Sequence, residues 1–384
     1  MSRDALIEEL ALAQSLVHAL VEDCDADSYR RQFHPDLSPM GWHLGHCVYV
    51  ECYWLHEQLR GDDSVTAPIA GLYMPPTTPK PEHGKRLPPQ DALLLWAQEL
   101  QAFNRHYLQK LPPELTAHPL LEDDYLLHFL IQHYSQHYET LLMILTQKAL
   151  QAPADGFEPA TPLLGSPLDD RRVEVPGGHY RVGGDRPVAF DNEVPPQHAE
   201  LGPFSISTRP VSNAEFLAFI EAGGYEDDAL WQESGRAWRR QTGASHPDHW
   251  RQSASGLWYG VGIRGPYELA PDEPVLGLSH HEADAFARWA GARLPHEYQW
   301  EAACRSGRLE QTGRAWEWCA NTFHPYAGFA PFPYDGYSKP WFDETHYTLR
   351  GGSLHTRPAI KRPSFRNFHR ADKRHIFAGL RLAW

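Results

Sequence analysis

Residues 132–139, Gln-His-Tyr-Ser-Gln-His-Tyr-Glu, constrain the fold of this chain more than any other stretch. They lie in a run from 125 to 145 without glycine or proline, whose apolar spacing predicts a helix. Residues four apart on a helix share a face, with Cβ atoms about 5–6 Å apart, so His133 and His137 could offer two imidazoles to one metal ion. The chain contains 23 histidines, so about one such pair is expected by chance, and ordinary surface histidines are the alternative. A third ligand is needed to decide whether this pair binds a metal ion or consists of ordinary surface histidines.

Length and composition predict a globular chain of two domains. The 384 residues are too many for one ordinary core. Hydrophobic residues make up 42% and charged residues 22%, as in soluble proteins, and no apolar run approaches the roughly 20 residues of a membrane span. The net charge of −14 argues against general nucleic-acid binding and against binding to an anionic membrane surface.

The N-terminus and the cysteines indicate a cytoplasmic protein. The chain enters a helical pattern directly and shows no signal peptide. Its five cysteines, an odd number without a Cys-x-x-Cys pair, fit reduced thiols better than a disulfide framework. Cys47 follows His46, but one helical step turns it about 100° away, so we interpret it as a small buried residue.

Residues 1–150 read as an all-helical domain. The first helix is expected at 4–24, and the second begins at Ser38 as N-cap, with Pro39 as its first helical residue. A proline-rich loop at 74–89 precedes a third helix at 89–108, and the fourth helix carries the two histidines. Four helices with one long connection predict a four-helix bundle, a fold that places metal sites among facing side chains.

His46, on the second predicted helix, is a candidate for the third ligand. His43 lies one turn earlier on nearly the same face, and the residues alone do not separate the two. Three neutral imidazoles with open positions make a catalytic site for zinc and for iron alike.

Residues 151–172 read as a linker, and residues 173–384 as a second, α+β domain with much irregular structure. Strand-like runs are expected at 173–183 and 199–207. A helix is expected at 212–221, and another starts with the capping box of Ser279 and Glu282. The remainder reads as turns and short strands.

The second domain resembles the formylglycine-generating-enzyme (sulfatase-modifying factor) fold, which is a C-type-lectin-like architecture. The resemblance rests on motifs such as Trp-Glu-Trp at 316–318 and Arg-Gly-Gly-Ser at 350–353. The matching stretches are 175–183, 190–193 with 210–216, 287–301, and 316–318 with 350–353. The first domain, with Trp-His-Leu-Gly-His at 42–46 and Gln-His-x-x-Gln-His-x-Glu at 132–139, looks like a DinB-type bundle.

This pairing of domains is similar to the domain organisation of the ergothioneine-type sulfoxide synthases. These are non-heme iron enzymes that use O2 to join a thiol sulfur to the imidazole of N-α-trimethylhistidine (hercynine). The family keeps the last histidine of the 42–46 segment, which selects His46 over His43. The resemblance thus implies that His46, His133 and His137 hold Fe(II), and that Gln136 helps to hold the substrate.

Residues 331–338, Pro-Phe-Pro-Tyr-Asp-Gly-Tyr-Ser, resemble the family's loop of two tyrosines. A three-histidine Fe(II) site leaves positions for a thiolate, an imidazole and O2, and the reaction also needs a proton from a nearby weak acid. The resemblance implies that Tyr334 is this proton donor and that Tyr337 lines the hercynine pocket. The alternative is a tyrosine in a turn beside Gly336, packed on an aromatic core.

The cation-rich residues 364–381 match the segment with which the family binds its substrates. Such substrates carry α-carboxylates, which arginine binds in bidentate fashion. The resemblance implies that Asn367 and Phe368 contact hercynine. The full set of expected substrate-binding residues is Gln136, Tyr337, Asn367, Phe368, His369, Arg370 and Lys373.

The chain departs from the family at His369. Members that use γ-glutamylcysteine have an acidic residue there, and an arginine near the position of Lys373. A histidine, with Arg370, Lys373 and Arg374 nearby, predicts a cationic pocket for another donor. Cysteine, or a selenosugar as in selenoneine synthases, is expected, while attack at C2 or C5 of the imidazole stays open.

Three other functions compete with this one. A zinc-dependent DinB-type thiol transferase would use the same three histidines without O2. A true formylglycine-generating enzyme needs a close cysteine pair near the C-terminus, whereas Cys304 and Cys319 are the only thiols after Cys52, and neither lies in 350–365. A non-catalytic binding module, common among lectin-like folds, would leave the three histidines unexplained.

Overall fold

The computed structural model describes residues 1–75, 77–115, 117–152 and 156–384. The chain forms two compact units, Met1–Gln151 and Ala152–Trp384. Residue 76 of the proline-rich segment and residues 153–155 of the expected linker lie outside the described residues. Within these ranges, none of the helices has the length and hydrophobicity that crossing a lipid bilayer requires.

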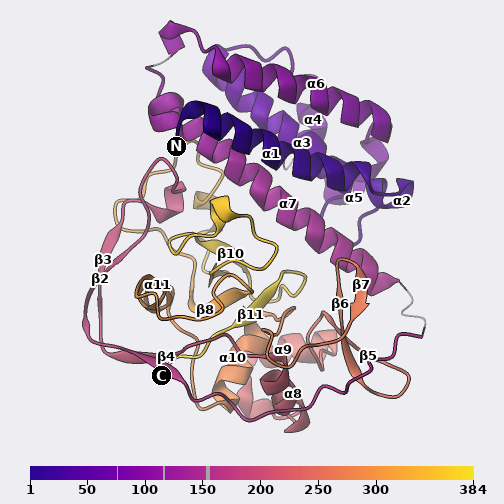
Figure 1. The fold of residues 1–384 in the computed structure, drawn as a ribbon, viewed down its shortest axis with the longest axis vertical. Coiled ribbons are helices and arrows are strands. Elements are labelled where there is room, and N and C mark those ends of the chain that lie inside the picture. Colours follow the sequence, from indigo (N-terminus) through magenta and orange to yellow (C-terminus); the bar gives the residue numbers. More distant parts are fainter. Residues whose placement is uncertain (76, 116, 153–155) are drawn as a thin grey trace. The chain divides into compact units, whose positions relative to one another are not determined.

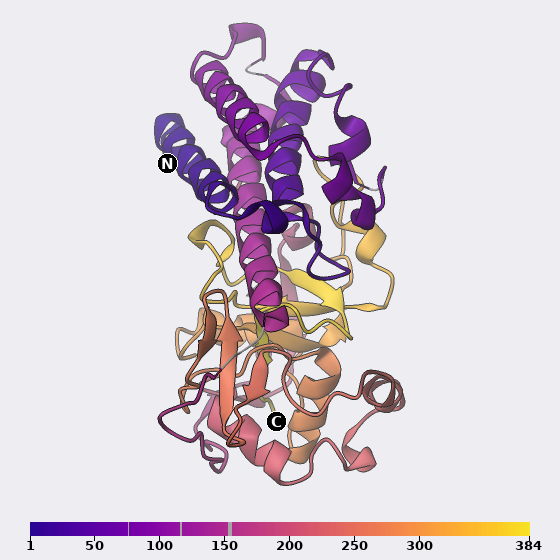
Figure 2. The same cartoon turned by 90° about the vertical axis from the view of Figure 1, so that its right-hand side faces the viewer.

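The N-terminal unit is a helical bundle, as the sequence predicts. Helix α1 packs against α6 and α7, and α3 packs against the same two helices (Figures 1 and 2). Helix α1 buries Leu6, Leu10, Val17 and Val21, the spacing of one helix face. The helices are α1 (Arg3–Glu22), α2 (Ala26–Arg30), α3 (Met40–Cys52), α4 (Ala70–Tyr73), α5 (Lys80–Arg86), α6 (Gln90–Gln109) and α7 (Tyr125–Gln151), with a π-helix at Tyr53–Gln58 and 3-10 turns at Pro113–Leu115 and Pro119–Asp124.

Two expectations for this unit are wrong. Pro39, not Ser38, is the N-cap of α3, and no side chain caps that helix. The Ser38 hydroxyl instead contacts Nδ1 of His83 at 3.0 Å. The proline-rich segment is also not all loop, because α5 forms within it with a proline in its first turn. Cys47 is fully buried, as expected.

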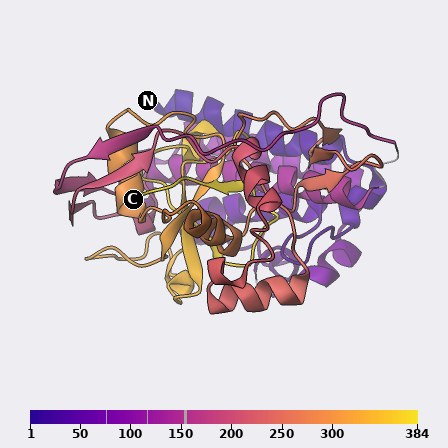
Figure 3. The same cartoon turned by 90° about the horizontal axis from the view of Figure 1, so that it is seen from below.

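The C-terminal unit contains four small sheets and four helices within its described residues. The largest sheet has the order β10-β9-β8-β11, in which only β11 and β8 are parallel. Strands β2 and β3 form a separate antiparallel ribbon, at the left of Figure 3. The other two sheets pair β1 with β4 and order β5-β6-β7.

The elements of this unit have the following bounds. The strands are β1 (Arg172–Val175), β2 (Gly178–Val182), β3 (Gln197–Leu201), β4 (Phe204–Ser207), β5 (Trp250–Gln252), β6 (Trp258–Gly262), β7 (Gly265–Tyr267), β8 (Trp316–Thr322), β9 (His346–Arg350), β10 (Asn367–Arg370) and β11 (Ala378–Leu380). The helices are α8 (Asn213–Glu221), α9 (Glu233–Thr242), α10 (His280–Trp289) and α11 (Glu297–Arg305), with 3-10 turns at Asp191–Glu193, Asp228–Leu230, Lys339–Trp341 and Pro358–Ile360.

Helix α8 starts at the capping box of Ser212 and Glu215, and the predicted capping box of Ser279 and Glu282 starts α10. Helices α9 and α11 were expected as turns or strands, so that expectation is wrong. The described part of the linker lies on this unit, where the Ser166 N–H donates to the Ala214 carbonyl at 3.1 Å.

Buried ion pairs lie in the core of the C-terminal unit. Arg350 lies 2.8 Å from Glu297 and 3.1 Å from Glu301, and all three side chains are at most 2% exposed. Arg381 pairs with the buried Glu317 at 2.7 Å, and Glu317 also accepts from the Trp300 indole at 2.6 Å. Removing one partner of such a pair would leave an uncompensated buried charge, so these groups hold the fold.

Candidate active site

Three imidazoles from two helices converge in the N-terminal unit. His46 lies on α3, and His133 and His137 lie one turn apart on α7. Each offers a ligand nitrogen, and these atoms all lie within 4.8 Å of one another. The ring centroids of His133 and His137 are 4.5 Å apart, and that of His46 lies 5.2 Å and 4.9 Å from them. At this spacing, three nitrogens can reach one metal ion.

The surroundings of His46 fix its tautomer. Its Nδ1–H donates to the carbonyl oxygen of Tyr73 at 2.7 Å, so the lone pair is left on Nε2. Gly45 permits this close approach, because a Cβ at that position would lie 2.2 Å from a carbon of the Tyr73 ring. The Trp42 indole stacks between His46 and His83, with its centroid 4.6 Å from each imidazole.

His43, the rival ligand candidate, contacts the trio from outside. Its Nδ1 lies 2.9 Å from Nδ1 of His137, so one of these two nitrogens donates to the other. If His137 binds a metal through Nε2, its Nδ1 carries the proton and His43 accepts it. In that arrangement His43 orients a ligand without being one.

The electrostatics of this cluster suit a metal cation. Burial lowers the pKa of His46 to about 4 and that of His43 to about 3, and it holds the pKa values of His133 and His137 well below the usual range. All four rings are therefore neutral near pH 7, the form in which imidazole binds metal. Nδ1 of His133 is buried and has no hydrogen-bond partner among the described residues. The donor set fits a three-histidine centre for iron or zinc.

A buried polar network behind the trio was not predicted from the sequence. The Glu51 carboxylate, 0% exposed, accepts hydrogen bonds from Tyr134 at 2.7 Å, Gln14 at 2.8 Å and Asn104 at 2.8 Å. These groups come from α3, α7, α1 and α6. The one available signal was a glutamate on an otherwise apolar stretch of α3.

Only one expected substrate-binding residue lies in the N-terminal unit. Gln136 is partly exposed on α7, next to His137 in sequence. The others belong to the C-terminal unit.

The predicted tyrosine loop connects β8 to β9. Tyr334 is 42% exposed, whereas Tyr337 is partly buried. The Tyr337 ring stacks on Phe190, with centroids 4.4 Å apart and planes at 19°. Tyr337 therefore packs on an aromatic ring, and the Tyr334 ring lies beside Gly336, where a Cβ would come within 2.8 Å of it.

The segment around residue 191 anchors this loop, which the sequence analysis missed. The Ser338 hydroxyl donates to the Asp191 carboxylate and accepts from the Asn192 amide at 3.0 Å. Burial raises the pKa of Asp191 to about 6, even though the bond from Ser338 lowers it. Three consecutive residues, 190–192, thus contact two consecutive residues of the loop. Phe190 packs on Tyr337, and Asp191 and Asn192 hydrogen-bond to Ser338.

Four of the residues expected to bind hercynine or the donor, 367–370, form β10, an edge strand paired with β9. Side chains alternate along a strand, so Asn367 and His369 share one face, and Phe368 and Arg370 the other. Phe368 stacks on Phe323, with centroids 4.3 Å apart. Arg370 is exposed.

Most arginines of residues 364–381 pair with carboxylates, so this segment is less cationic than its sequence suggests. Lys373 lies 3.3 Å from Asp372. Three arginines have ion-pair partners within the unit, namely Arg366 with Glu297 at 2.8 Å, Arg374 with Glu282 at 2.9 Å and Arg381 with Glu317 at 2.7 Å. Arg370 is the exposed arginine that this segment contributes.

Two families match this chain. Residues 9–141 match the DinB superfamily, and residues 166–312 and 310–384 match the sulfatase-modifying factor enzyme 1-like domain. A formylglycine-generating enzyme of Thermomonospora curvata is 36% identical over 38% of this chain and 51% of its own length. The structure of PvdO from Pseudomonas aeruginosa is 17% identical and covers 55% of this chain and 93% of its own, with a TM-score of 0.39.

The relatives that match the whole chain include two hercynine oxygenases of different species. The hercynine oxygenase of Mycolicibacterium smegmatis is 33% identical over 100% of this chain and 99% of the relative. The hercynine oxygenase of Mycobacterium tuberculosis is 31% identical, again over 100% of this chain and 99% of its own length. With both domain matches and this coverage, the chain belongs to the hercynine oxygenase family, the ergothioneine-type sulfoxide synthases, and is an enzyme of that family.

Proposed function

We propose that this enzyme uses Fe(II) and O2 to join a thiol or selenol donor to the imidazole of hercynine or a related histidine derivative. The observation that carries the proposal is the convergence of His46, His133 and His137, with the His46 tautomer fixed by the Tyr73 carbonyl. The names of the full-length relatives supply the imidazole substrate.

The proposed reaction of a thiol balances as an oxidation by one O2. The S–H bond of the donor and one C–H bond of the imidazole break, and a C–S bond and an S–O bond form. Four electrons pass to O2, and its second oxygen leaves with two protons as water. Fe(II) held by three neutral imidazoles would supply open coordination positions and the redox step.

The chain's own residues would divide the remaining work. Gln136, Tyr337, Asn367 and Phe368 hold the imidazole substrate, so that its reacting carbon meets the donor atom in near-attack geometry. Tyr334 supplies the proton, for which an exposed phenol that is neutral at pH 7 is suited. The packing of Tyr337 on Phe190 supports its assignment as a pocket wall.

We further propose that the donor is cysteine or an oxygen-rich seleno- or thiosugar. His369 stands where an acidic residue would meet the amino group of γ-glutamylcysteine, and the exposed Arg370, on the other face of the same strand, adds no negative charge. Such surroundings favour carboxylate or hydroxyl oxygens over an ammonium group. A selenosugar would make the enzyme a selenoneine synthase.

The test is aerobic incubation of the Fe(II)-loaded protein with hercynine and a panel of donors, followed by O2 uptake and product mass spectrometry. The variants His46→Ala, His133→Ala and His137→Ala should lose both iron and the coupled product. His106→Ala is the control, because this histidine is exposed on α6.

His43→Ala separates an orienting residue from a ligand. It should keep iron stoichiometry and weaken affinity about 10- to 100-fold, as loss of a partner behind a ligand does. Full iron and activity in His46→Ala, with loss of both in His43→Ala, would refute the ligand set. Tight zinc binding with thiol transfer and no O2 uptake would favour a zinc-dependent thiol transferase instead.

A further inference from the structure

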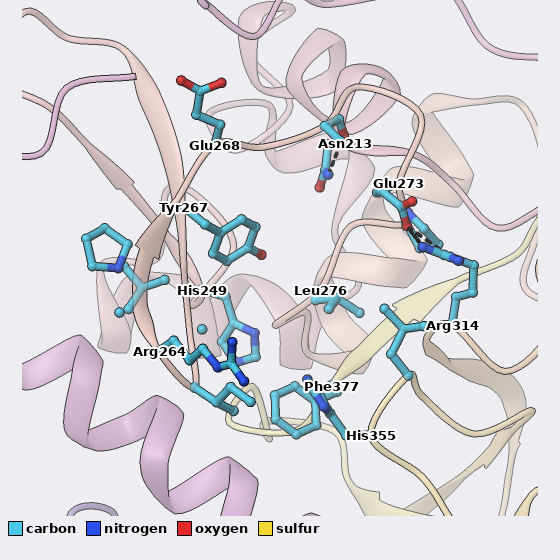
Figure 4. A pocket seen from close by; sticks show the side chains of 18 residues that line it. Asn213, His249, Arg264, Tyr267, Glu268, Glu273, Leu276, Arg314, His355 and Phe377 are labelled. Atoms are coloured by element: carbon cyan, nitrogen blue, oxygen red, sulfur yellow. Dashed lines mark hydrogen bonds and ion pairs between the residues drawn. The ribbon is translucent and has the colours of Figure 1, made fainter. Parts of the chain in front are cut away.

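A pocket lies wholly within the C-terminal unit, with a volume of about 440 Å³ (Figure 4). The hairpin of β6 and β7 forms one wall, and segments around Leu276, Leu354 and Phe377 form the others. None of its lining residues is among those expected to bind metal or substrate. Its volume lies within the range of about 300–1,000 Å³ that is typical of small-molecule sites.

One end of the pocket carries a buried polar atom without a partner. His249 is 2% exposed, and its Nε2 has no hydrogen-bond partner among the described residues. Burial lowers its pKa to about 4, so the ring is neutral near pH 7. A buried polar group without a hydrogen bond is unfavourable, and a ligand that bonds to it in the pocket removes that cost.

Aromatic rings line this end of the pocket. The Phe377 ring lies between two imidazoles, with centroids 5.8 Å from His249 and 4.4 Å from His355. Gly277, at φ +81°, leaves space for His249, because a Cβ there would lie 2.8 Å from its Cγ. Aromatic side chains at this end of the pocket suit a ligand that has an aromatic ring of its own.

The opposite wall depends on a second glycine. A Cβ on Gly260 would lie 2.3 Å from Cζ of Tyr267, so only glycine lets this ring pack across the hairpin. Val261 and Ile263 of the same hairpin, with Leu276, make this part of the lining apolar.

The charges of the pocket differ between its ends. Arg314 donates from Nε to Glu273 at 2.9 Å, and Glu268 accepts from the Ala160 N–H at 2.6 Å. Arg264, exposed in the turn between β6 and β7, forms no ion pair with any described residue. Figure 4 shows its guanidinium directed toward His249 and Phe377, and the Glu268 carboxylate directed away from them.

We propose that this pocket binds a small heteroaromatic monocarboxylate whose ring carries an N–H. The ring would pack on Phe377 and the apolar wall, the ring N–H would donate to Nε2 of His249, and the carboxylate would accept from Arg264. The unpartnered imidazole nitrogen of His249, the Phe377 ring and the guanidinium of Arg264 together define this ligand class. The site is independent of the proposed metal centre and of its substrates.

Isothermal titration of the full-length protein with indole-2-carboxylate tests the proposal. We expect one saturable site with a Kd on the order of 100 µM, a typical affinity for a ligand of this size. Indole-2-carboxamide lacks the charge and naphthalene-2-carboxylate lacks the N–H, so each should bind about tenfold more weakly.

Variants locate the site. Arg264→Ala should weaken binding about tenfold, while Arg288→Ala, an exposed arginine on α10 paired with Asp284, should not change it. Because Arg264 is exposed, its removal does not threaten the fold. His249→Phe should also weaken binding, and its melting temperature reports whether it folds.

The variant His137→Ala tests whether the ligand binds at the proposed active site instead. It should bind indole-2-carboxylate with the affinity of the parent protein. No saturable binding up to millimolar ligand would overturn the proposal. An affinity unchanged by Arg264→Ala, equal for the carboxamide, or lost in His137→Ala would overturn it as well.

Discussion

The hydroxyl of Tyr134 donates a hydrogen bond to the carboxylate of Glu51 at 2.7 Å, and both side chains are fully buried. Tyr134 follows His133 on α7, and Glu51 lies on α3, the helix of His46. The bond therefore ties together the two helices that carry the three imidazoles. Burial raises the pKa of both groups.

Removing this hydroxyl should loosen the centre without touching a ligand. In Tyr134→Phe, Glu51 keeps its amide donors but loses its phenol, and we expect the free energy of unfolding to fall by about 1–2 kcal/mol. Iron affinity should fall about tenfold, as it does when support behind metal ligands is lost. Urea denaturation and Fe(II) titration measure both, with Tyr138→Phe on the same helix as control. Equal Fe(II) affinities in the two variants would show that this hydrogen-bond network does not support the metal centre.

Tyr334 and Tyr337 should give different phenotypes, although they lie three residues apart. Without its phenol, Tyr334→Phe should still consume O2 but form the adduct about 100-fold more slowly, releasing oxidised donor instead. Tyr337→Phe keeps the ring that stacks on Phe190, so the product ratio should stay unchanged. The measurement is the amount of adduct and of oxidised donor formed per O2 consumed, determined by mass spectrometry. An unchanged ratio in Tyr334→Phe would make Tyr337 the next candidate.

Local sequence patterns predicted the elements that local interactions determine. His133 and His137 share a helix face because of helix geometry alone, and the predicted capping box of Ser279 marks a real helix start. Ser38 misled because its hydroxyl contacts His83, far away in sequence, instead of capping α3. Tertiary contacts can override a local preference in this way.

The choice between His43 and His46 also needed more than local physics. Both imidazoles reach the cluster, and the Nδ1 atom of His43 lies 2.9 Å from that of His137. The ion-pair partners of Arg366 and Arg374 were equally invisible, because they lie 69 and 92 residues away along the chain. A run of arginines in a sequence therefore does not reveal how many remain available to a ligand.

Acid should destabilise the C-terminal unit through Glu297. Burial alone would raise its pKa, but the charges of Arg366 and Arg350 outweigh burial and lower it from 4.5 to about 2. A carboxyl with a lowered pKa stabilises the fold above the pKa of the unfolded chain. This contribution, on the order of 3 kcal/mol, should be lost as pH falls from 4.5 toward 2.

Urea unfolding followed by tryptophan fluorescence between pH 7 and pH 2 measures this loss. Glu297→Gln should cost about 3–5 kcal/mol at pH 7, because it leaves two buried arginines short of a partner, and its stability should vary less below pH 4.5. Glu200→Gln, an exposed position on β3, is the control. A parent-like pH profile in Glu297→Gln would assign the acid sensitivity to other carboxyls.

The donor preference should follow the residue at position 369. A histidine cannot supply the full negative charge that an ammonium group needs, and Arg370 beside it is exposed and cationic. The cationic character is smaller than the sequence suggests, because Glu282 neutralises Arg374. A buried charge mismatch still costs a few kcal/mol, so cysteine or an oxygen-rich seleno- or thiosugar should be preferred over γ-glutamylcysteine by roughly a hundredfold in kcat/KM.

Competition between donors at equal concentration in one aerobic reaction measures this preference. His369→Asp restores the negative charge and should shift kcat/KM toward γ-glutamylcysteine by at least about tenfold, because the carboxylate can pair with the donor's ammonium group. His198→Asp adds the same charge at an exposed position on β3 and should leave the ratio unchanged. If the parent enzyme uses γ-glutamylcysteine as well as cysteine, or if both aspartate variants shift the ratio equally, then His369 does not set the choice of donor.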